Sequence, residues 1–422
     1  MSLLLIILML VAILFGVPIT FALGIASLVF FIAQGIPLEA FAQRLAVGVD
    51  SFPLLAVPFF IMAGNLMNSG GITLRIFRFS NSLVGHIRGG LGHVNVLSSM
   101  IFAGMSGSAI ADAAGLGPIE IKAMTEAGYD LEFSTAVTVA SAVIGPIIPP
   151  STIMIIYGVT AGVPISRLFK GGIIPGILLG LALMALVYFY SLKNNYPKSD
   201  KFSFKEFFIS FKDTFPALLT PLIIIGGILG GVFTPTEAGA VAAFYALIIT
   251  LFVYKEIKIR DLPKIFFETA LTTGVILFIV STASIFGWSL SFEQAPQMVA
   301  GFLASITTNK VLLMLMLTVV YTFMGMIMEA AAIVITTVPI IVPVLNALGI
   351  DLVFFGVILA IVMSIGTITP PVGTVMFVIC KITGLTIERY TKIIIPWFLV
   401  EMGVIILLIF IPQLVLFIPS LM

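Results

Sequence analysis

Two motifs place adjacent prolines beside glycine and hydroxyl residues within apolar stretches: Gly145-Pro-Ile-Ile-Pro-Pro-Ser151 and Gly366-Thr-Ile-Thr-Pro-Pro-Val-Gly373. Proline has no backbone N–H and its ring clashes with the preceding turn, so two adjacent prolines should unwind a helix. At membrane depth, the freed carbonyls are tolerated only against protein or a water-filled cavity. Carbonyl oxygens joined by Ser or Thr hydroxyls suit a hard monovalent cation, and the N-termini of half-helices suit an anionic group. The motifs therefore predict two related cation sites, with two simple kinks as the alternative.

A third polar set lies in Gly104–Gly117, where Ser106, Ser108 and Asp112 interrupt an apolar neighbourhood. The flanking segments, roughly residues 91–105 and 113–127, are short for two separate crossings of a bilayer. We therefore predict a re-entrant helical hairpin near residues 91–127, with its tip near Ser106–Ser108. Asp112 has two interpretations: it caps the second arm of this hairpin, or it faces a cavity.

A second hairpin is predicted near residues 312–348, with its tip near Met328 and Glu329. Glu329 stands in a long apolar run. On insertion scales, a charged Arg, Lys or Asp at the centre of a span costs ~2.5–3.5 kcal/mol. Glu329 therefore either lines a wet cavity or is protonated.

The two hairpins belong to an internal repeat with a fixed offset of 221 residues. Residues 102–150 align without gaps on residues 323–371, with 16 identities in 49 positions. The identities include glycines, prolines and Asp130 over Asp351 in the same order, which favours duplication over chance similarity between apolar segments. In membrane transporters, duplication commonly gives halves of inverted topology.

Charge placement supports inversion of the two halves. Arg75, Arg78 and Arg88 precede the first hairpin, whereas the counterpart segment 293–309 carries no Lys or Arg. Because cytoplasmic loops are enriched in Lys and Arg, the two segments should lie on opposite sides of the membrane. We predict an N-terminal repeat over residues 1–211 and an inverted C-terminal repeat over residues 212–422, with hairpins that enter from opposite faces.

The composition of the whole chain indicates which class of protein must position these polar residues. The 422 residues are 60% hydrophobic and 9% charged, with a mean hydropathy of +1.24, which excludes an ordinary soluble domain. Continuous apolar runs predict an all-α polytopic membrane protein of about ten spans plus the two hairpins, rather than a barrel of alternating strands. The net charge of +1 carries no information about the substrate, and no nucleic-acid partner is expected. The single cysteine, Cys380, rules out an internal disulfide.

The longest polar stretch, Lys193–Asp213, has five lysines, three acids and five phenylalanines. It predicts an amphipathic linker that lies on the cytoplasmic surface. Pro37–Pro53 and Ser291–Asn309 are predicted to be outward loops. Glu237, three residues after Thr234, is predicted to cap the start of a helix.

Several of these motifs together resemble a known family. They are Gly104-Met-Ser-Gly-Ser-Ala-Ile-Ala-Asp112, Pro146-Ile-Ile-Pro-Pro-Ser151, Phe233-Thr-Pro-Thr-Glu-Ala-Gly239 and Thr369-Pro-Pro-Val-Gly373. In combination they are similar to the large, DctM-like membrane subunit of tripartite ATP-independent periplasmic (TRAP) transporters, over essentially the whole chain. The resemblance implies an ion-transporter-superfamily fold in the bacterial inner membrane, in which a transport domain moves against a scaffold as an elevator.

The resemblance also implies sodium-driven import of an organic acid, such as a C4-dicarboxylate or sialic acid. A soluble periplasmic binding protein should deliver this substrate, and a small four-helix membrane subunit should complete the complex in the lipid bilayer. The family's sodium sites lie at the hairpin tips and facing breaks. Carried onto this sequence, they are Ser106, Gly107, Ser108, Gly145, Pro149, Pro150, Ser151, Gly366, Thr367, Thr369, Pro370 and Gly373. Asp112 and Glu329 are candidates for the substrate cavity.

Other functions remain as alternatives at this stage. A stand-alone ion-coupled carboxylate transporter would use the same sites without a binding protein, and an ion channel would also place polar residues at depth. An enzyme is not expected, because the chain lacks the His-Glu-x-x-His and Gly-x-x-x-x-Gly-Lys motifs. The second absence also argues against ATP-driven pumping.

Overall fold

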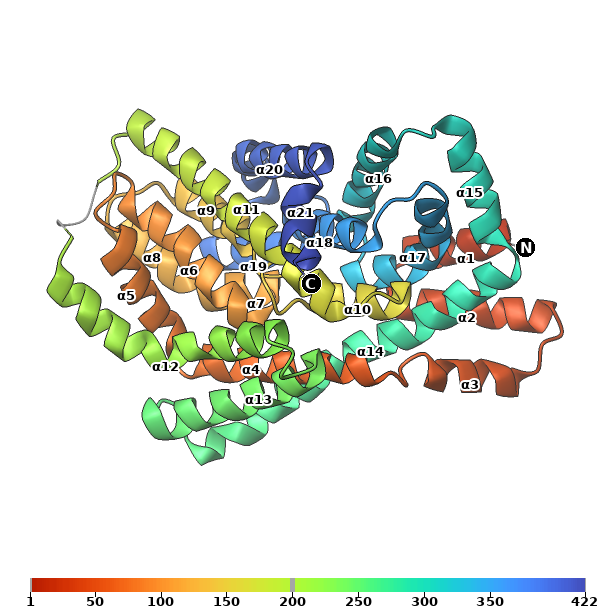
Figure 1. The fold of residues 1–422 in the computed structure, drawn as a ribbon, viewed down its shortest axis with the longest axis horizontal. Coiled ribbons are helices and arrows are strands. Elements are labelled where there is room, and N and C mark those ends of the chain that lie inside the picture. Colours follow the sequence, from red (N-terminus) through yellow and green to blue (C-terminus); the bar gives the residue numbers. More distant parts are fainter. Residues whose placement is uncertain (1, 198–201, 422) are drawn as a thin grey trace.

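The computed structural model describes residues 2–197 and 202–421, and every regular element in those ranges is a helix (Figure 1). The predicted all-α fold is therefore confirmed. Seven of the described helices are long and apolar enough to cross a membrane. They are Phe52–Ser69, Ile165–Lys193, Phe204–Leu229, Pro235–Val253, Ile259–Phe292, Ala330–Ala347 and Ile387–Phe410.

The first half of the chain opens with α1 (Ser2–Leu14) and α2 (Ile19–Ala33), which pack against each other across a break at residues 15–18. Then come α3 (Leu38–Val47), the 3-10 turn η1 (Phe52–Leu55), α4 (Ala56–Ser69) and α5 (Ile72–Val84). The first hairpin consists of α6 (Gly90–Ser106), α7 (Ala109–Gly115) and α8 (Gly117–Glu126). It is followed by α9 (Leu131–Ala142), α10 (Thr152–Ala161) and α11 (Ile165–Lys193).

The second half follows the same order. It starts with α12 (Phe204–Leu229), α13 (Pro235–Ile248), the π-helical turn η2 (Ile249–Val253) and the 3-10 turn η3 (Ile259–Asp261). Next are α14 (Leu262–Phe292) and α15 (Ala295–Ile306), and the second hairpin, α16 (Lys310–Gly325) and α17 (Ala330–Ala347). The chain ends with α18 (Leu352–Ile368), α19 (Thr374–Thr383), α20 (Ile387–Phe410) and α21 (Gln413–Ser420).

Helices of the two halves exchange contacts at the centre of the molecule. The second arm of the first hairpin, α7, packs against α19, and the second arm of the second hairpin, α17, packs against α10. Figure 1 shows the hairpin α6–α8 in the left half of the view and the hairpin α16–α17 in the right half. The two hairpins therefore lie in opposite halves of the molecule in this view.

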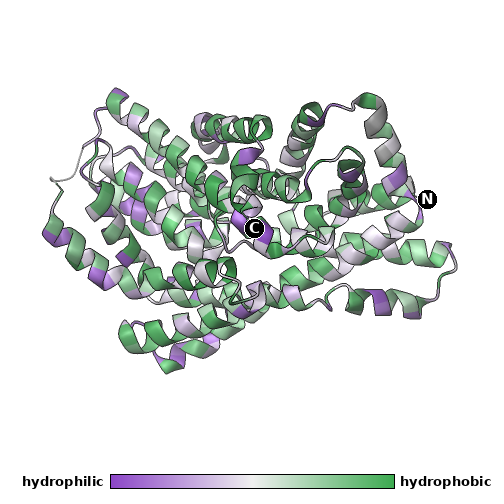
Figure 2. Cartoon of the chain, viewed as in Figure 1, coloured by the Kyte–Doolittle hydropathy of each residue, from purple (hydrophilic) through white to green (hydrophobic). Residues whose placement is uncertain are grey.

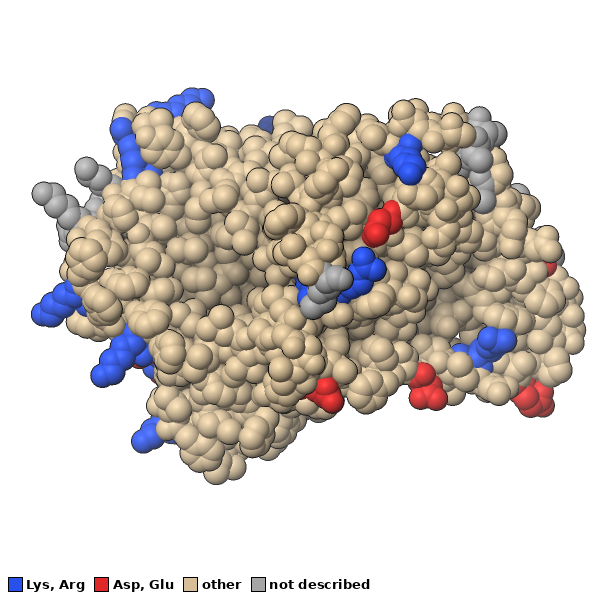
Figure 3. All heavy atoms as spheres, in the orientation of Figure 1, with Lys and Arg blue, Asp and Glu red and all other residues tan. Residues whose placement is uncertain are grey.

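The surface is apolar, as a lipid-facing surface must be. Figure 2 shows helices that are predominantly hydrophobic, with hydrophilic residues concentrated near helix ends. Large side chains are exposed along several spans, including Phe21, Leu222, Phe267 and Leu399. On the face in Figure 3, Lys and Arg gather at the left end, and broad areas between the charged spots carry no charge. A bilayer would cover these areas by the hydrophobic effect.

Two sequence predictions about connections need correction. The stretch Lys193–Asp213 is not one surface linker, because α11 includes Lys193 and α12 already begins at Phe204. Within α12, the rings of Phe207 and Phe211 pack at a tilt against Phe79 of α5, and this packing continues the helix into the polar stretch. A repeat boundary at residue 211 therefore falls inside a helix. Pro37–Pro53 and Ser291–Asn309 are not loops either, since they contain α3 and α15.

The cap prediction for Glu237 is confirmed. The Thr234 hydroxyl accepts a hydrogen bond from the Glu237 N–H at 3.3 Å, and the Glu237 carboxylate accepts one from the Thr234 N–H at 2.8 Å. This reciprocal capping box satisfies two N–H groups at the start of α13.

Candidate functional site

The first hairpin turns at Ser106–Ser108, which we call the first tip. Gly107 has φ +61°, in the left-handed region that favours glycine. Ser108 is the N-cap of α7, and its hydroxyl accepts a hydrogen bond from the Ala111 N–H at 3.4 Å. The predicted tip is therefore confirmed, although its second arm begins at Ala109 rather than Ala113.

The first proline motif interrupts the helix with turns and bends rather than only kinking it. Helix α9 ends at Ala142 and α10 begins at Thr152, and we call the intervening residues 143–151 the first break. Ser151 is the N-cap of α10, and its hydroxyl accepts a hydrogen bond from the Met154 N–H at 3.2 Å. Most residues of the first break are buried in the chain, so protein surrounds the freed carbonyls.

The first tip lies directly against the first break. A β-carbon added at Gly107 would lie 2.5 Å from the Pro150 carbonyl oxygen. One added at Gly145 would lie 3.0 Å from the Ser108 carbonyl oxygen, and one at Gly104 would lie 3.9 Å from that of Pro149. The structure thus brings the predicted residues of the first cation site together, with glycines where backbone carbonyls approach most closely.

Ser106 supplies an unused ligand at this junction. Its hydroxyl oxygen is buried and finds no hydrogen-bond partner among the described residues. A buried hydroxyl without a partner is costly unless something else binds it. Hydroxyl and carbonyl oxygens are the ligand types that suit a sodium ion, and Ser106, Ser108 and Pro150 supply them along the first tip and the first break.

The second tip and second break repeat this arrangement. Between α16 and α17 the chain turns at residues 326–329, the second tip, and between α18 and α19 it is non-helical at residues 369–373, the second break. The Val372 N–H donates to the Met326 carbonyl at 3.1 Å. A β-carbon added at Gly366 would lie 2.7 Å from the Gly325 Cα. Each tip therefore meets the break of its own half.

Hydroxyls and carbonyls also converge at the second break. The hydroxyls of Thr367 and Thr369 donate to the carbonyls of Ser364 and Ile365 at 2.6 Å and 2.7 Å, which leaves their oxygen lone pairs available as acceptors. A β-carbon on Gly373 would lie 2.7 Å from the Thr367 carbonyl oxygen and 2.9 Å from that of Thr369. Pro370 directly follows Thr369 in the sequence. This oxygen set also fits a sodium ion.

Glu329 has a role that the sequence analysis missed. It is the N-cap of α17, and its Oε2 accepts hydrogen bonds from the Ala331 N–H at 2.8 Å and the Ala332 N–H at 3.3 Å. The side chain is exposed in this chain. The repeat alignment held the signal, because Glu329 aligns with the cap residue Ser108 at the offset of 221 residues.

The cap interpretation of Asp112 is wrong, because Ser108 caps α7 instead. Asp112 is completely buried, and its Oδ1 accepts a hydrogen bond from the Ser99 hydroxyl at 3.0 Å. The hydroxyl oxygens of Ser99 and Ser141 lie 3.1 Å apart, and Ser141 donates to the Asn95 side-chain oxygen at 2.8 Å. This network was not predicted from the sequence. The available signal was the spacing of Asn95 and Ser99, which lie four residues apart on one helix face.

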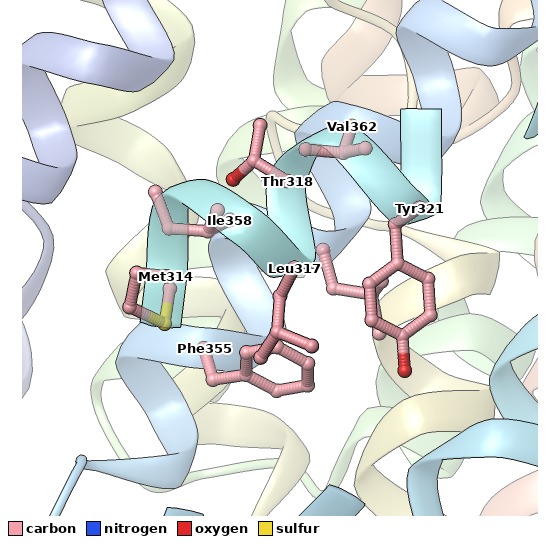
Figure 4. A pocket seen from close by; sticks show the side chains of 8 residues that line it. Met314, Leu317, Thr318, Tyr321, Phe355, Ile358 and Val362 are labelled. Atoms are coloured by element: carbon pink, nitrogen blue, oxygen red, sulfur yellow. The ribbon is translucent and has the colours of Figure 1, made fainter. Parts of the chain in front are cut away.

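Other features of the described residues do not form a site. A cavity between α16 and α18 has room of only about 10 Å³, less than one water needs, and is lined mainly by apolar side chains (Figure 4). In Figure 4 the Tyr321 hydroxyl points away from Leu317 and Phe355, and it donates to Thr337 at 2.8 Å. Within residues 2–197 and 202–421, no group of three His, Cys, Asp or Glu side chains could hold a metal ion.

Comparison with known proteins connects this arrangement to transport. The family model of the tripartite ATP-independent periplasmic transporter, DctM component, matches residues 6–414. The chain is 43% identical to the sialic acid TRAP transporter large permease protein SiaM of Vibrio cholerae, covering 96% of this chain and 95% of SiaM. It is 36% identical to the C4-dicarboxylate TRAP transporter large permease protein DctM of Pseudomonas aeruginosa, covering 90% of each chain.

A longer relative and two solved structures are also similar. The sialic acid TRAP transporter permease protein SiaT of Haemophilus influenzae is 43% identical over 96% of this chain, which spans 66% of SiaT's length. The YdaH transporter of Alcanivorax borkumensis has a TM-score of 0.66, at 15% identity and 88% coverage of both chains. MtrF of Neisseria gonorrhoeae has a TM-score of 0.63, at 15% identity, with 90% of this chain and 85% of MtrF covered. These two similarities show the fold alone.

The paired tips and breaks, the apolar helical surface and the match over nearly the full length agree with one another. The chain is a multi-pass protein of the bacterial inner membrane and a transporter permease rather than an enzyme, and it belongs to the DctM family of TRAP transporter large permease proteins.

Proposed function

We propose that this chain imports an organic acid by sodium-coupled alternating access, with one sodium site where each tip meets its break. The observation that carries the proposal is the repeated tip-and-break contact, Gly107 against Pro150 and Met326 against Val372. Broken helices that meet near the centre of two repeats are typical of the ion and substrate sites of secondary transporters. ATP is not required, because the sodium gradient supplies the driving force.

The residues proposed for sodium fall into two sets. The first set is Ser106, Gly107, Ser108, Gly145, Pro149, Pro150 and Ser151, and the second is Gly366, Thr367, Thr369, Pro370 and Gly373. In each set, backbone carbonyls and hydroxyl oxygens would replace water around the ion. The second break is partly exposed whereas the first is mostly buried, so the second site has the shorter route to solvent in this conformation.

The substrate class is proposed from the relatives and from chemistry. The relatives' names specify sialic acid, 2,3-diketo-L-gulonate and C4-dicarboxylates, all of which carry a carboxylate. Bound sodium and the N-terminal ends of α10 and α19 would offset the negative charge of such a substrate. Asp112 is completely buried, so of the two cavity candidates we place the exposed Glu329 near the substrate path.

A tripartite complex is proposed for delivery. A soluble periplasmic binding protein would capture the substrate, and a small four-helix membrane subunit would pack on the scaffold and broaden it. The docking surface for the binding protein would include α3 and α15, which form the segments predicted to face outward. A stand-alone transporter is the alternative, and only uptake measurements with and without the binding protein separate the two.

The moving parts are proposed from packing. The hairpins, the broken helices, α11 and α20 contact one another and would form the transport domain, whereas α1–α4 and α12–α14 would form the scaffold. We place the division between two inverted repeats in the connection from Lys193 to Phe204, rather than at residue 211, because no helix crosses it there.

The test is uptake into liposomes that contain this chain, its small membrane subunit and the binding protein. An inward sodium gradient should drive accumulation of radiolabelled sialic acid or a C4-dicarboxylate, and a potassium gradient should not. Thr369→Ala should raise the half-saturating sodium concentration roughly tenfold, because a charge-assisted contact contributes about 1.5–3 kcal/mol.

A matched control is Thr383→Ala. Its hydroxyl also donates to a backbone carbonyl, that of Ile379 at 2.9 Å, but it lies at the far end of α19. This variant should keep the sodium dependence of the unmodified chain. Substrate accumulation by the unmodified complex that does not depend on the sodium gradient would refute sodium coupling. Passive flux of substrate without accumulation would indicate a channel.

A further inference from the structure

The first hairpin carries a buried polar network that the transport proposal has not used. Asn95 donates to the Thr138 hydroxyl at 2.6 Å and accepts from Ser141, and Ser141 and Ser99 lead on to Asp112. The second oxygen of Asp112 and both carboxylate oxygens of Glu120 have no hydrogen-bond partner among the described residues. Both acidic residues are completely buried.

No basic side chain neutralises these two carboxylates among the described residues. Lys122, on the same helix as Glu120, is exposed and pairs with Glu126 at 3.9 Å. Arg389 reaches α9 but pairs with Glu132, and Lys381 of α19 is exposed. Because uncompensated charge is costly in a low-dielectric interior, an ionised carboxylate in this network would be stabilised by a cation close by.

The second half has no such network. At the offset of 221 residues, Asn95, Ser99, Asp112, Glu120, Thr138 and Ser141 correspond to Met316, Val320, Ile333, Ile341, Leu359 and Val362. Every polar member is replaced by an apolar residue, although the helices that carry them correspond. Chain folding therefore does not require the polar set at these positions, which favours a functional reason for it in the first half.

The network is close to the first tip along the helices that carry it. The Asp112 N–H donates to the Ser108 carbonyl at 3.1 Å, so the Asp112 backbone lies one helical turn from the tip. Ser141 comes one turn before Gly145, which itself approaches the Ser108 carbonyl. The second tip also carries an acid, Glu329, but that side chain is exposed and its charge is shared with two backbone N–H groups.

We propose that Asp112, held by Ser99, is a positioning residue whose buried negative charge makes the first sodium site bind sodium more tightly than the second. This inference rests on the proposed sodium sites. A buried carboxylate that acts through protein attracts a cation strongly, so the apolar Ile333 at the position that matches Asp112 leaves the second site weaker. Sodium should then occupy the first site at the lower concentration. Occupancy of the second site should change with the sodium concentration near the half-saturation of that site.

The experiment measures binding of radioactive sodium to the purified complex. The unmodified complex should show two phases, and Thr369→Ala should weaken the lower-affinity phase, which assigns that phase to the second break. Asp112→Asn keeps the size of the side chain and an oxygen that can accept from Ser99. It should weaken the higher-affinity phase on the order of tenfold and leave the other phase within about twofold.

Neutral variants separate charge from folding. Thr138→Val removes a hydroxyl from the same network without removing charge, and it should leave both phases within about twofold. Asp112→Glu should restore part of the sodium affinity that Asp112→Asn loses. In Ser99→Ala, the affinity of the tighter phase should lie between that of the unmodified complex and that of Asp112→Asn.

The outcomes are distinguishable. Two phases that Asp112→Asn leaves unchanged, or weakens equally, would overturn the role of Asp112 while keeping the sodium sites. The same loss in Thr138→Val as in Asp112→Asn would also overturn it, because the effect would then be structural. Absence of sodium binding in the unmodified complex would instead refute the proposed function itself.

Discussion

Ser108 and Glu329 occupy the same place in the two halves of the chain: each is the N-cap of the second arm of its hairpin. The cap is a neutral hydroxyl at the first tip and a carboxylate with two accepted hydrogen bonds at the second. Both satisfy N–H groups that a helix start leaves open. The two tips therefore share one architecture and differ in charge.

Replacement of the acidic cap should destabilise the second hairpin. Glu329→Ala removes both hydrogen bonds to Ala331 and Ala332, and we expect a loss of about 1 kcal/mol in the free energy of unfolding. Glu329→Ser, which installs the residue found at the first tip, should recover most of that loss. Thermal unfolding in detergent measures both. Equal stability of the Ala and Ser variants would contradict the cap role.

Gly366, in the last turn of α18 before the second break, should not tolerate a larger side chain. In Gly366→Ala the new methyl group would lie 2.7 Å from the Gly325 Cα, and neither backbone can yield without separating the tip from the break. We expect uptake to fall at least roughly tenfold, since overpacking of this kind costs about 1–3 kcal/mol. Gly403→Ala is the matched control, because a β-carbon there meets nothing within 4 Å. Normal uptake by Gly366→Ala would show that the contact is not required.

Arg75 should hold three segments of the chain together. Its guanidinium lies 3.1 Å from Glu256, 3.5 Å from Asp213 and 4.1 Å from the ring centroid of Tyr254. Lysine cannot reproduce a planar group that both pairs and stacks, so Arg75→Lys should lower the free energy of unfolding by roughly 1 kcal/mol. Arg78→Lys, at an exposed position of the same helix, should have little effect. Calorimetry of the purified variants measures their unfolding transitions. Equal transition temperatures for Arg75→Lys and Arg78→Lys would contradict a stabilising role for the Arg75 contacts.

A disulfide between scaffold and transport domain should arrest uptake. A β-carbon on Gly64 of α4 would lie 3.9 Å from that of Ser106, close to the ~3.8 Å typical of disulfides. In a Cys380→Ser background, the Gly64→Cys/Ser106→Cys protein should lose uptake on oxidation and regain its own reduced level with a reductant. Phe59→Cys/Gly239→Cys joins α4 to α13 within the scaffold and should stay equally active in both states. Continued uptake by the oxidised first pair would exclude movement between α4 and the first tip.

Local chemistry made much of the fold predictable from the sequence. The apolar runs predicted helices, because a backbone in hydrocarbon must satisfy its own hydrogen bonds. The adjacent prolines predicted the unwound segments at residues 143–151 and 369–373, because proline removes a donor wherever it stands. The turn at Gly107 and the capping box at Thr234 and Glu237 follow equally from neighbours in the sequence.

Only the tertiary structure decided which of these segments meet. The repeat offset shows that Gly104 and Gly325 are equivalent, but it does not show that Gly107 faces Pro150, that Gly325 faces Gly366, or that α7 packs on α19. It also left open whether Asp112 capped a helix or faced a cavity, and in the structure Asp112 is buried beside Ser99. Such contacts join residues far apart in the chain, and packing of whole helices sets them. Sequence by itself determined the local pieces, and tertiary packing turned them into two candidate ion sites of unequal surroundings.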